Sequence, residues 1–232
     1  MCGRYSITTP VDALQKLFDF ADPAPSLAPR YNLAPGQDAP VLRLDSTLPT
    51  PRRRLVMLRW GLVPAWAKDA RAGDGMINAR GETVDERPTF RAAFQKRRCL
   101  VLADGFYEWQ GAAGRRVPYR IEFEGRRPFA MAGLWESWTG PEGVALETFA
   151  IVTTDANPAL APIHHRMPVI VPPWAQPAWL GEEAADAAHL KALLRPYEED
   201  DMIAYQISPR INKAAVDDPS VLERHQDMAR LL

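Results

Sequence analysis

Short strand-like segments separated by turns and prolines are the feature that most limits what this chain can fold into. Eight such segments lie at residues 41–44, 55–60, 99–103, 106–109, 119–123, 128–134, 148–153 and 168–171. The 22 prolines among 232 residues are roughly twice the usual share of about 5%, and they are spread too evenly to mark a linker. The pattern predicts a β-rich core in one domain that spans residues 1–232.

Helical segments interrupt these strands and place the chain in the α+β class. The first is predicted over residues 10–20, with Thr9 as N-cap, Pro10 as the first helical residue and three apolar residues on one face. Further helices are predicted at residues 89–96, 182–195 and 219–232. Residues 21–40 contain five prolines and are predicted to form a long ordered loop.

Several classes of protein are excluded by composition. The longest apolar run covers only residues 129–135, well short of the roughly 18 that a membrane helix needs. The chain starts without a basic region followed by an apolar stretch, so we expect no secretory signal and a cytoplasmic protein. The two cysteines, Cys2 and Cys99, are too few for a disulfide framework or a cysteine-only zinc site. We therefore expect neither a metal nor another cofactor.

The charge is unevenly distributed along the chain although the formal net charge is only −1. Residues 1–127 hold 21 Lys and Arg against 14 Asp and Glu, whereas residues 128–232 hold 7 against 15. Arginine, which suits bidentate phosphate contacts, supplies 23 of the 28 cations. The first half therefore predicts a basic face that attracts phosphates, although a biased but merely solvated surface gives the same count.

Cys2 carries the most specific chemistry in the chain. An initiator methionine is normally removed before a small side chain, so a mature chain would begin with Cys2 and present a free α-amine beside a thiol. Their ordinary pKa values of about 8 and about 8.5 leave both partly nucleophilic near neutrality. The amine can condense with an aldehyde to an imine and the thiol can then close a thiazolidine. The other interpretation is a cysteine that packs by chance at the start of a buried strand.

Two polar groups could assist such chemistry. Asn78 could orient an amine or a carbonyl and Arg80 could bind a phosphate, although the same residues are common in turns. Glu108 lies in a predicted strand rich in aromatic residues. Because side chains alternate along a strand, Glu108 shares one face with Phe106, and Tyr107 points to the other face. If it is desolvated, its pKa rises and it can act as a general acid or base near pH 7. If it lies at a wet sheet edge, it cannot.

His164 and His165 are two of the four histidines and stand beside Arg166. Adjacent side chains in an extended segment point to opposite sides, so at most one of them is expected to face a site. Two histidines that ligate one metal ion would be expected on the same side of the segment, and the sequence offers no evident third ligand.

Six motifs together resemble the SRAP family, the SOS-response-associated peptidase-like or abasic-site processing proteins. They lie at residues 1–4, 30–36, 60–64, 77–80, 103–109 and 164–168, in order along nearly the whole chain. The resemblance implies a barrel-like β core with flanking helices that binds single-stranded DNA, traps abasic sites covalently and shields them from strand cleavage. We also expect single-strand to duplex junctions as partners, because a sugar in a stacked and paired helix is enclosed, and we expect no membrane contact and a monomer.

The resemblance assigns roles residue by residue. It makes Cys2 the crosslinking residue, Asn78 the holder of the reacting N-terminus, Glu108 the acid and base, and His164 the second proton donor. The residues that fall where the family touches DNA are Arg4, Asn32, Pro35, Arg80, Thr153 and Arg166. We also expect Trp66 to bind DNA by offering a surface on which bases stack. Residues 68–75 are polar and lack aromatics, so base stacking near Trp66 is the least defined of these expectations.

Two other functions remain open at this stage. In an N-terminal-nucleophile amidohydrolase or peptidase, the Cys2 thiol attacks an amide and its own amine serves as the base. The word peptidase in the family's name could also describe only the removal of residues before Cys2. Lyase-type chemistry on the DNA is a further reaction class that the sequence leaves open. In a non-covalent DNA-binding module, the cysteine is incidental.

Overall fold

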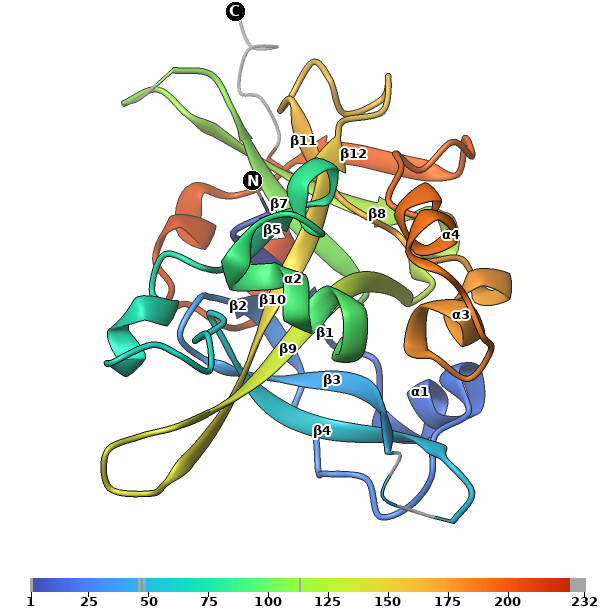
Figure 1. The fold of residues 1–232 in the computed structure, drawn as a ribbon. Coiled ribbons are helices and arrows are strands. Elements are labelled where there is room, and N and C mark those ends of the chain that lie inside the picture. The colour runs from blue at the N-terminus through green and yellow to red at the C-terminus, as the bar shows by residue number, and fades with distance from the viewer. Residues whose placement is uncertain (1, 46, 48, 113, 226–232) are drawn as a thin grey trace, which may run out of the picture.

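A computed structural model describes residues 2–45, 47, 49–112 and 114–225 (Figure 1). The predicted removal of Met1 concerns a residue outside this part. The strands form two sheets that share one apolar core, to which Tyr5 and Phe106 contribute from one sheet and Leu100 and Phe149 from the other. No helix among the described residues is both long and apolar enough to cross a membrane.

The larger sheet closes into a five-stranded barrel. Its strands are β3 (Asp38–Asp45), β4 (Arg52–Trp60), β6 (Arg98–Ala103), β9 (Phe129–Thr139) and β10 (Ala145–Asp155). The barrel closes because β10 pairs with β9 on one side and with β4 on the other, where Phe149 lies opposite Trp60. The last residues of β10 also pair with β5 (Asn78–Arg80) and β11 (Arg166–Pro168). The expected barrel-like core is confirmed.

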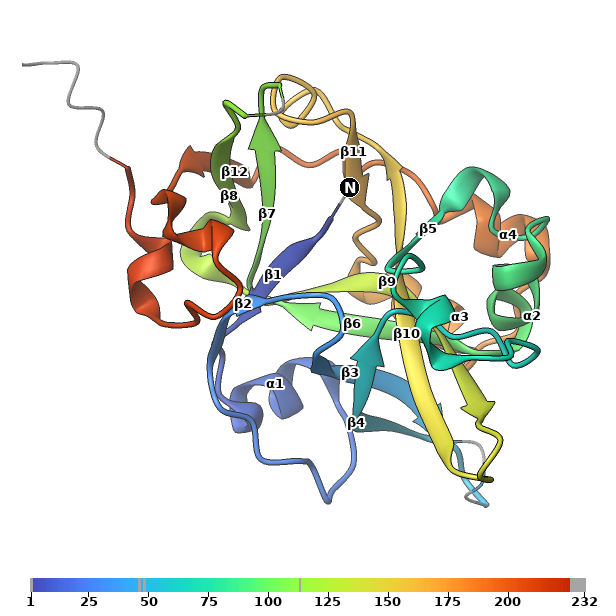
Figure 2. The same cartoon turned by 90° about the vertical axis from the view of Figure 1, so that its left-hand side faces the viewer.

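The second sheet is open and lies beside the barrel (Figure 2). Its order is β12 (Met202–Gln206), β8 (Val117–Phe123), β7 (Gly105–Gln110), β1 (Arg4–Ile7) and β2 (Arg30–Leu33). β1 pairs antiparallel with β7, with Arg4 opposite Tyr107. This register brings the residues before Arg4 alongside those after Tyr107, so the start of the chain meets the end of β7.

Within the described ranges, four helices surround the sheets: α1 (Val11–Phe18), α2 (Pro88–Lys96), α3 (Gln176–Leu180) and α4 (Ala187–Ala192). Single 3-10 turns occur at Ala70–Gly73, Gly81–Thr83, Glu124–Arg126, Pro173–Ala175, Pro209–Asn212 and Pro219–Leu222. The first two helices were expected at nearly these positions. The N-cap prediction was wrong, because Pro10 has an extended ψ of 147° and Thr9 hydrogen-bonds to Asp104 instead.

Other local predictions were also wrong. The helix expected at 182–195 is reduced to α4, which starts after Asp186 caps the backbone of His189. The helix expected at 219–232 is one 3-10 turn as far as Leu222, and residues 226–232 lie outside the described part. The loop expected at 21–40 contains β2 and the start of β3.

The strand expected at 168–171 ends at Pro168. Beyond it the backbone alternates between two partners, since Val169 donates to Val152 and Val171 donates to Ala130. No continuous ladder with one neighbour can form there.

A buried ionic cluster underlies β1. Arg120 donates to Glu122 at 2.7 Å and to the hydroxyl of Ser6 at 2.8 Å, and its guanidinium lies 3.5 Å from Asp104. Asp104 in turn accepts the Ser6 hydroxyl at 2.6 Å. Gly105 makes room for this cluster, because a Cβ there would lie 2.4 Å from the Arg120 guanidinium carbon. The cluster fixes β1, and with it the position of the residues that precede β1.

Candidate active site

Cys2 is fully buried at the entrance to β1. Its thiol lies 4.0 Å from the carbonyl oxygen of Arg4. Burial raises the pKa of the Cys2 thiol far above its ordinary value, and the nearby carboxylate of Glu108 raises it further. The thiol is therefore neutral at physiological pH and needs a base to become nucleophilic.

Asn78 reaches Cys2 from the other sheet. It begins β5, whose parallel pairing with β10 sets it opposite Ile151. Its side-chain nitrogen donates to the carbonyl oxygen of Cys2 at 3.0 Å. Its side-chain oxygen is buried and accepts no hydrogen bond from the described residues. An acceptor is thus held next to the backbone of Cys2.

Glu108 lies in β7, an inner strand between β1 and β8, and is only 4% exposed. Desolvation raises the pKa of its carboxyl to about 7. The expected alternation is confirmed, since Phe106 packs in the main core whereas Tyr107 packs with Trp109 in a smaller cluster. The interpretation as a wet edge-strand glutamate is excluded. Such a carboxyl can both give and take a proton near neutral pH.

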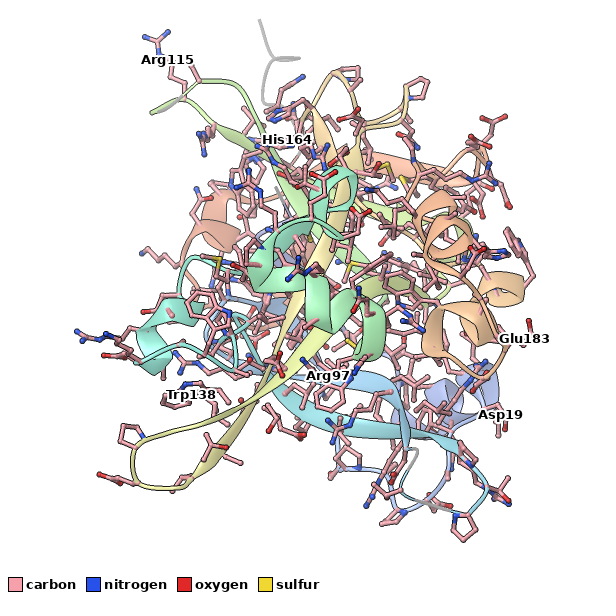
Figure 3. The ribbon with its side chains drawn as sticks, in the orientation of Figure 1. Asp19, Arg97, Arg115, Trp138, His164 and Glu183 are labelled. Atoms are coloured by element: carbon pink, nitrogen blue, oxygen red, sulfur yellow. The ribbon has the colours of Figure 1, made fainter. Side chains whose placement is uncertain are left out.

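His164 precedes β11 and brings its ring to Glu108, with 3.9 Å between Nδ1 and the carboxylate oxygen Oε1. The same nitrogen lies 3.0 Å from the backbone N–H and 3.2 Å from the carbonyl oxygen of Arg166. Burial lowers the pKa of His164, which favours the neutral imidazole. His165 does not point to the opposite side as expected, because the two rings stack with centroids 4.4 Å apart. The labelled ring of His164 lies at one end of the molecule, close to β7 (Figure 3).

Four of the predicted DNA-contacting residues are engaged within the protein. Asn32 is fully buried and its amide donates to three backbone carbonyls, while its oxygen accepts from Arg4 at 2.8 Å. Arg166 is buried between Glu82 and Asp155, at 2.7 Å from each, and also binds the carbonyl of the buried Thr153. Arg4 is only partly exposed. Direct contacts of these side chains with DNA stay predictions.

Pro35, Trp66 and Arg80 are exposed and can meet a ligand without rearrangement. The side chain of Trp66 is 68% exposed. Arg80 ends the strand that Asn78 begins, and no carboxylate of the described chain lies within ion-pair distance of it. These three residues supply exposed apolar surface and a cation, and Arg80 shares β5 with Asn78.

A hollow of about 510 Å³ opens beside Gly3, next to Cys2. Its other lining residues are Arg4, Trp109, Gly114, Arg116 and Asn212. Trp109 donates its indole N–H to Asn212 at 2.7 Å. Arg116 is exposed and its charge lowers the pKa values of both Glu108 and His164. Sequence reasoning did not select Trp109, Arg116 or Asn212, although the excess of arginine in the first half pointed to cations such as Arg116.

No group of three or more His, Cys, Asp or Glu in the described ranges is arranged to hold a metal ion. What the site holds is a thiol, an amide, a carboxyl of raised pKa and an imidazole, which together can transfer protons around a nucleophile.

Comparisons with known proteins agree on one group of relatives. The family model described as SOS response associated peptidase (SRAP) matches residues 1–214. The abasic site processing protein YoqW of Bacillus subtilis (strain 168) is 40% identical over 228 residues, which are 97% of this chain and 100% of YoqW. The abasic site processing protein HMCES of Rattus norvegicus is 31% identical and aligns with 96% of this chain and 75% of its own.

Solved structures show the same fold. A protein from Bacteroides thetaiotaomicron superimposes with a TM-score of 0.86 at 26% identity, covering 97% of this chain and all of the other. A protein from Bordetella bronchiseptica superimposes with a TM-score of 0.74 at 26% identity, covering 89% of this chain and all of the other.

Proposed function

The chain belongs to the SOS response associated peptidase (SRAP) family, and we propose that it captures abasic sites in single-stranded DNA as a covalent adduct of Cys2. Relatives in the family are named abasic site processing proteins. The observation that carries the proposal is the convergence of four groups from separate elements. The Asn78 amide binds the backbone of Cys2 at 3.0 Å, and the carboxylate of Glu108 is near enough to raise the pKa of the Cys2 thiol and lies 3.9 Å from His164.

The first step opens the sugar. An abasic deoxyribose is mostly a closed hemiacetal, so a proton must leave the C1′ hydroxyl while another reaches the ring oxygen before the aldehyde appears. Glu108 has a pKa of about 7, so both of its protonation states are populated near neutral pH. His164 provides a second proton carrier 3.9 Å away.

The second step joins the protein to the aldehyde. With Met1 removed, the free amine of Cys2 attacks C1′ and the carbonyl oxygen leaves as water, which yields an imine. The buried side-chain oxygen of Asn78 is suited to accept an N–H of this amine and to orient its lone pair, because the Asn78 nitrogen already holds the Cys2 carbonyl.

The third step closes the ring. The Cys2 thiol is neutral because burial raises its pKa, so it must lose its proton as it attacks C1′. The Glu108 carboxylate is the base available nearby. Sγ then bonds to C1′, and the imine nitrogen takes up a proton. The resulting thiazolidine consumes the aldehyde that drives β-elimination, so the lesion is shielded rather than cut.

The DNA strand is expected to follow the exposed groups around Cys2. The hollow with Arg4 and Arg116 gives phosphates a cationic path, Arg80 adds a cation on the other side, and Trp66 offers a stacking surface. Cys2 lies at a buried chain terminus, so the sugar must leave its stack to reach it. Unstacking costs least in single strands or where a single strand meets a duplex end.

The test is the intact mass of the Met1-processed protein after incubation with an abasic single strand. We expect the mass of the strand to be added, less one water, and to survive denaturation. Cys2→Ser should remove the stable adduct, because an oxazolidine hydrolyses readily, whereas Cys99→Ala in the barrel should retain it as the matched control. An undiminished adduct with Cys2→Ser would sink the proposal.

The proton-transfer roles have their own test. Glu108→Gln and His164→Ala should slow adduct formation by about 10²- to 10⁴-fold with little loss of strand affinity, since proton transfer typically contributes that much. His165→Ala is the control, because its exposed ring adjoins His164 but is not the ring that meets Glu108. Equal slowing by all three variants would contradict the assignment.

The word peptidase in the family's name suggests one alternative function, that of an N-terminal-nucleophile amidohydrolase in which Cys2 attacks an amide. The raised pKa of the Cys2 thiol speaks against a resting thiolate. Incubating the processed protein with casein in the absence of DNA separates the two functions: release of peptides that Cys2→Ser abolishes supports the hydrolase, and the absence of cleavage leaves capture of aldehydes.

A further inference from the structure

A groove on the helical side of the molecule extends from α1 to residues 156–159, where Ala156 donates its backbone N–H to the carbonyl oxygen of His165. Three adjoining hollows all share Tyr197 and Glu199, and we name their union the Tyr197 groove. One end is formed by α1 and the turn before α3, through Leu17 and Pro172, and the other reaches Asp200. In Figures 1 and 3, α1 and α3 lie on the right, remote from the N-terminus and from His164.

The α1 end of the Tyr197 groove exposes large apolar side chains. Five such side chains are prominently exposed in the described chain, and two of them, Trp174 at 66% and Leu17 at 53%, border this groove. Ile170 and Val171 supply the apolar floor between them. Exposed aromatic and branched side chains around a concave apolar surface mark interaction sites rather than ordinary solvent-facing surface.

The middle and the opposite end of the Tyr197 groove are acidic, since Glu199 lines all three hollows and Asp200 lines the last. Glu198, Glu199 and Asp200 are consecutive and exposed. The two arginines that line the groove already face acids, Arg127 at 2.5 Å from Asp201 and Arg195 at 3.6 Å from Glu198.

The carboxylates of Glu199 and Asp200 face no arginine of the groove, and Glu199 accepts the hydroxyl of Tyr197 at 3.1 Å. Among the residues that the structure describes, no cation lies within ion-pair distance of Glu199 or Asp200. The surrounding segment, residues 182–201, carries seven carboxylates and two cations. A ligand with both apolar and positively charged groups therefore complements this surface, whereas the phosphates of DNA would be repelled.

We propose that the Tyr197 groove docks a short segment of a partner protein in which one aromatic or branched apolar side chain is flanked by Lys or Arg. The apolar side chain would pack on Trp174 and Ile170, and the flanking cations would meet Glu199 and Asp200. Cys2, Glu108 and His164 do not line the groove, so such a partner can bind while a DNA strand occupies the site. The surface thus provides a way to recruit a second protein to a captured strand.

The experiment selects a random 12-residue peptide library, displayed on phage, against the immobilised protein. Enriched peptides are then synthesised with a fluorophore, and their affinities are measured by anisotropy. We expect the enriched peptides to carry a net positive charge and an apolar anchor. Trp174→Ala should weaken them by about tenfold or more, as expected for an aromatic anchor. Asp200→Lys should weaken them less and reduce the salt dependence of binding.

Val144→Ala is the matched control, because Val144 is 67% exposed but lies in the turn between β9 and β10, outside the groove. Failure to enrich peptides, enrichment of acidic peptides, or equal affinity for Trp174→Ala and the unmodified protein would overturn the proposal. So would a concentration-dependent dimer in sedimentation that Trp174→Ala abolishes, since the occupant would then be a second copy. Adduct formation should be unchanged in Trp174→Ala, and its loss would place the groove in the DNA site instead.

Discussion

The open sheet and the closed barrel are built from similar strands but bury different groups. The barrel encloses side chains such as Leu100, Val101 and Phe149, and its one buried carboxylate, Glu136, is paired with Arg97. The open sheet buries Arg120, Glu122 and Glu108, with Asp104 at the start of β7.

The two sheets therefore contribute differently to the protein. The barrel supplies apolar stability, whereas the open sheet keeps charged groups away from water, and there desolvation raises the pKa of Glu108. Cys2 and Glu108 belong to the open sheet, and the barrel side contributes Asn78 through β5 and places His164 before β11. The reactive group therefore lies where the two sheets meet.

Arg120→Met should have the largest effect on stability. It leaves Asp104 and Glu122 buried without their shared cation, and breaking a buried pair in this way typically costs about 3–5 kcal/mol. Urea unfolding measures the loss. Arg116→Met, an exposed arginine just before β8, should change stability by no more than about 0.5 kcal/mol. A loss below about 1 kcal/mol for Arg120→Met would remove the distinction between the two sheets.

Leu100→Ala should destabilise the barrel by about 2–5 kcal/mol, through lost apolar transfer and a residual cavity. The rate of adduct formation by the folded fraction should stay unchanged, because no reactive group contacts this side chain. Urea unfolding and mass spectrometry on the same sample give both quantities. A slowed reaction in fully folded protein would mean that the barrel takes part in the chemistry.

Glu108→Gln should change the pH dependence of stability. The folded-state pKa of about 7 lies above the ordinary 4.5, so the protonated carboxyl is favoured on folding and this contribution is lost as pH rises through about 7. Between about pH 5 and about pH 8 the natural protein should lose about 2 kcal/mol relative to Glu108→Gln. Thermal unfolding at the two pH values tests this, and parallel profiles for the two proteins would contradict the raised pKa.

Arg80→Ala should have the smallest effect. Removing one phosphate contact should weaken single-strand binding severalfold and reduce the slope of log affinity against log salt by about 0.7. Arg52→Ala is the control, since Arg52 is also exposed but lies beside Asp19 and Glu182 on the helical side. Fluorescence anisotropy at several salt concentrations separates them. Identical slopes for both variants would mean that Arg80 does not touch the strand.

Local pattern predicted the strands well where a short apolar run or a cluster of aromatic residues marked them, as in β6 and β7. It failed at β2, where prolines suggested a loop, because this strand depends on distant partners. β1 pairs along one edge, and Asp217 accepts the backbone N–H groups of Tyr31 and Asn32 along the other. It failed again at α4, where three carboxylates within residues 182–195 lie in a polar stretch of which only Ala187–Ala192 is helical.

Prediction of the candidate site from the sequence also succeeded for some residues and not for others. Cys2, Asn78, Glu108 and His164 were selected from the sequence, and the structure brings them together. Asn32, Thr153 and Arg166 were also selected, yet their polar groups bind other parts of the protein. A motif shows that a residue matters in its family, but it does not show whether the side chain faces a ligand or its own neighbours.

The sequence by itself determined which reactive groups the chain contains and where they stand in the order of strands. Only the tertiary structure decided that Cys2 meets Glu108, because the β1–β7 register joins residues more than a hundred positions apart. It also decided their proton affinities. A pKa shift comes from desolvation and from nearby charges, and both are properties of the surroundings that folding creates rather than of the residue.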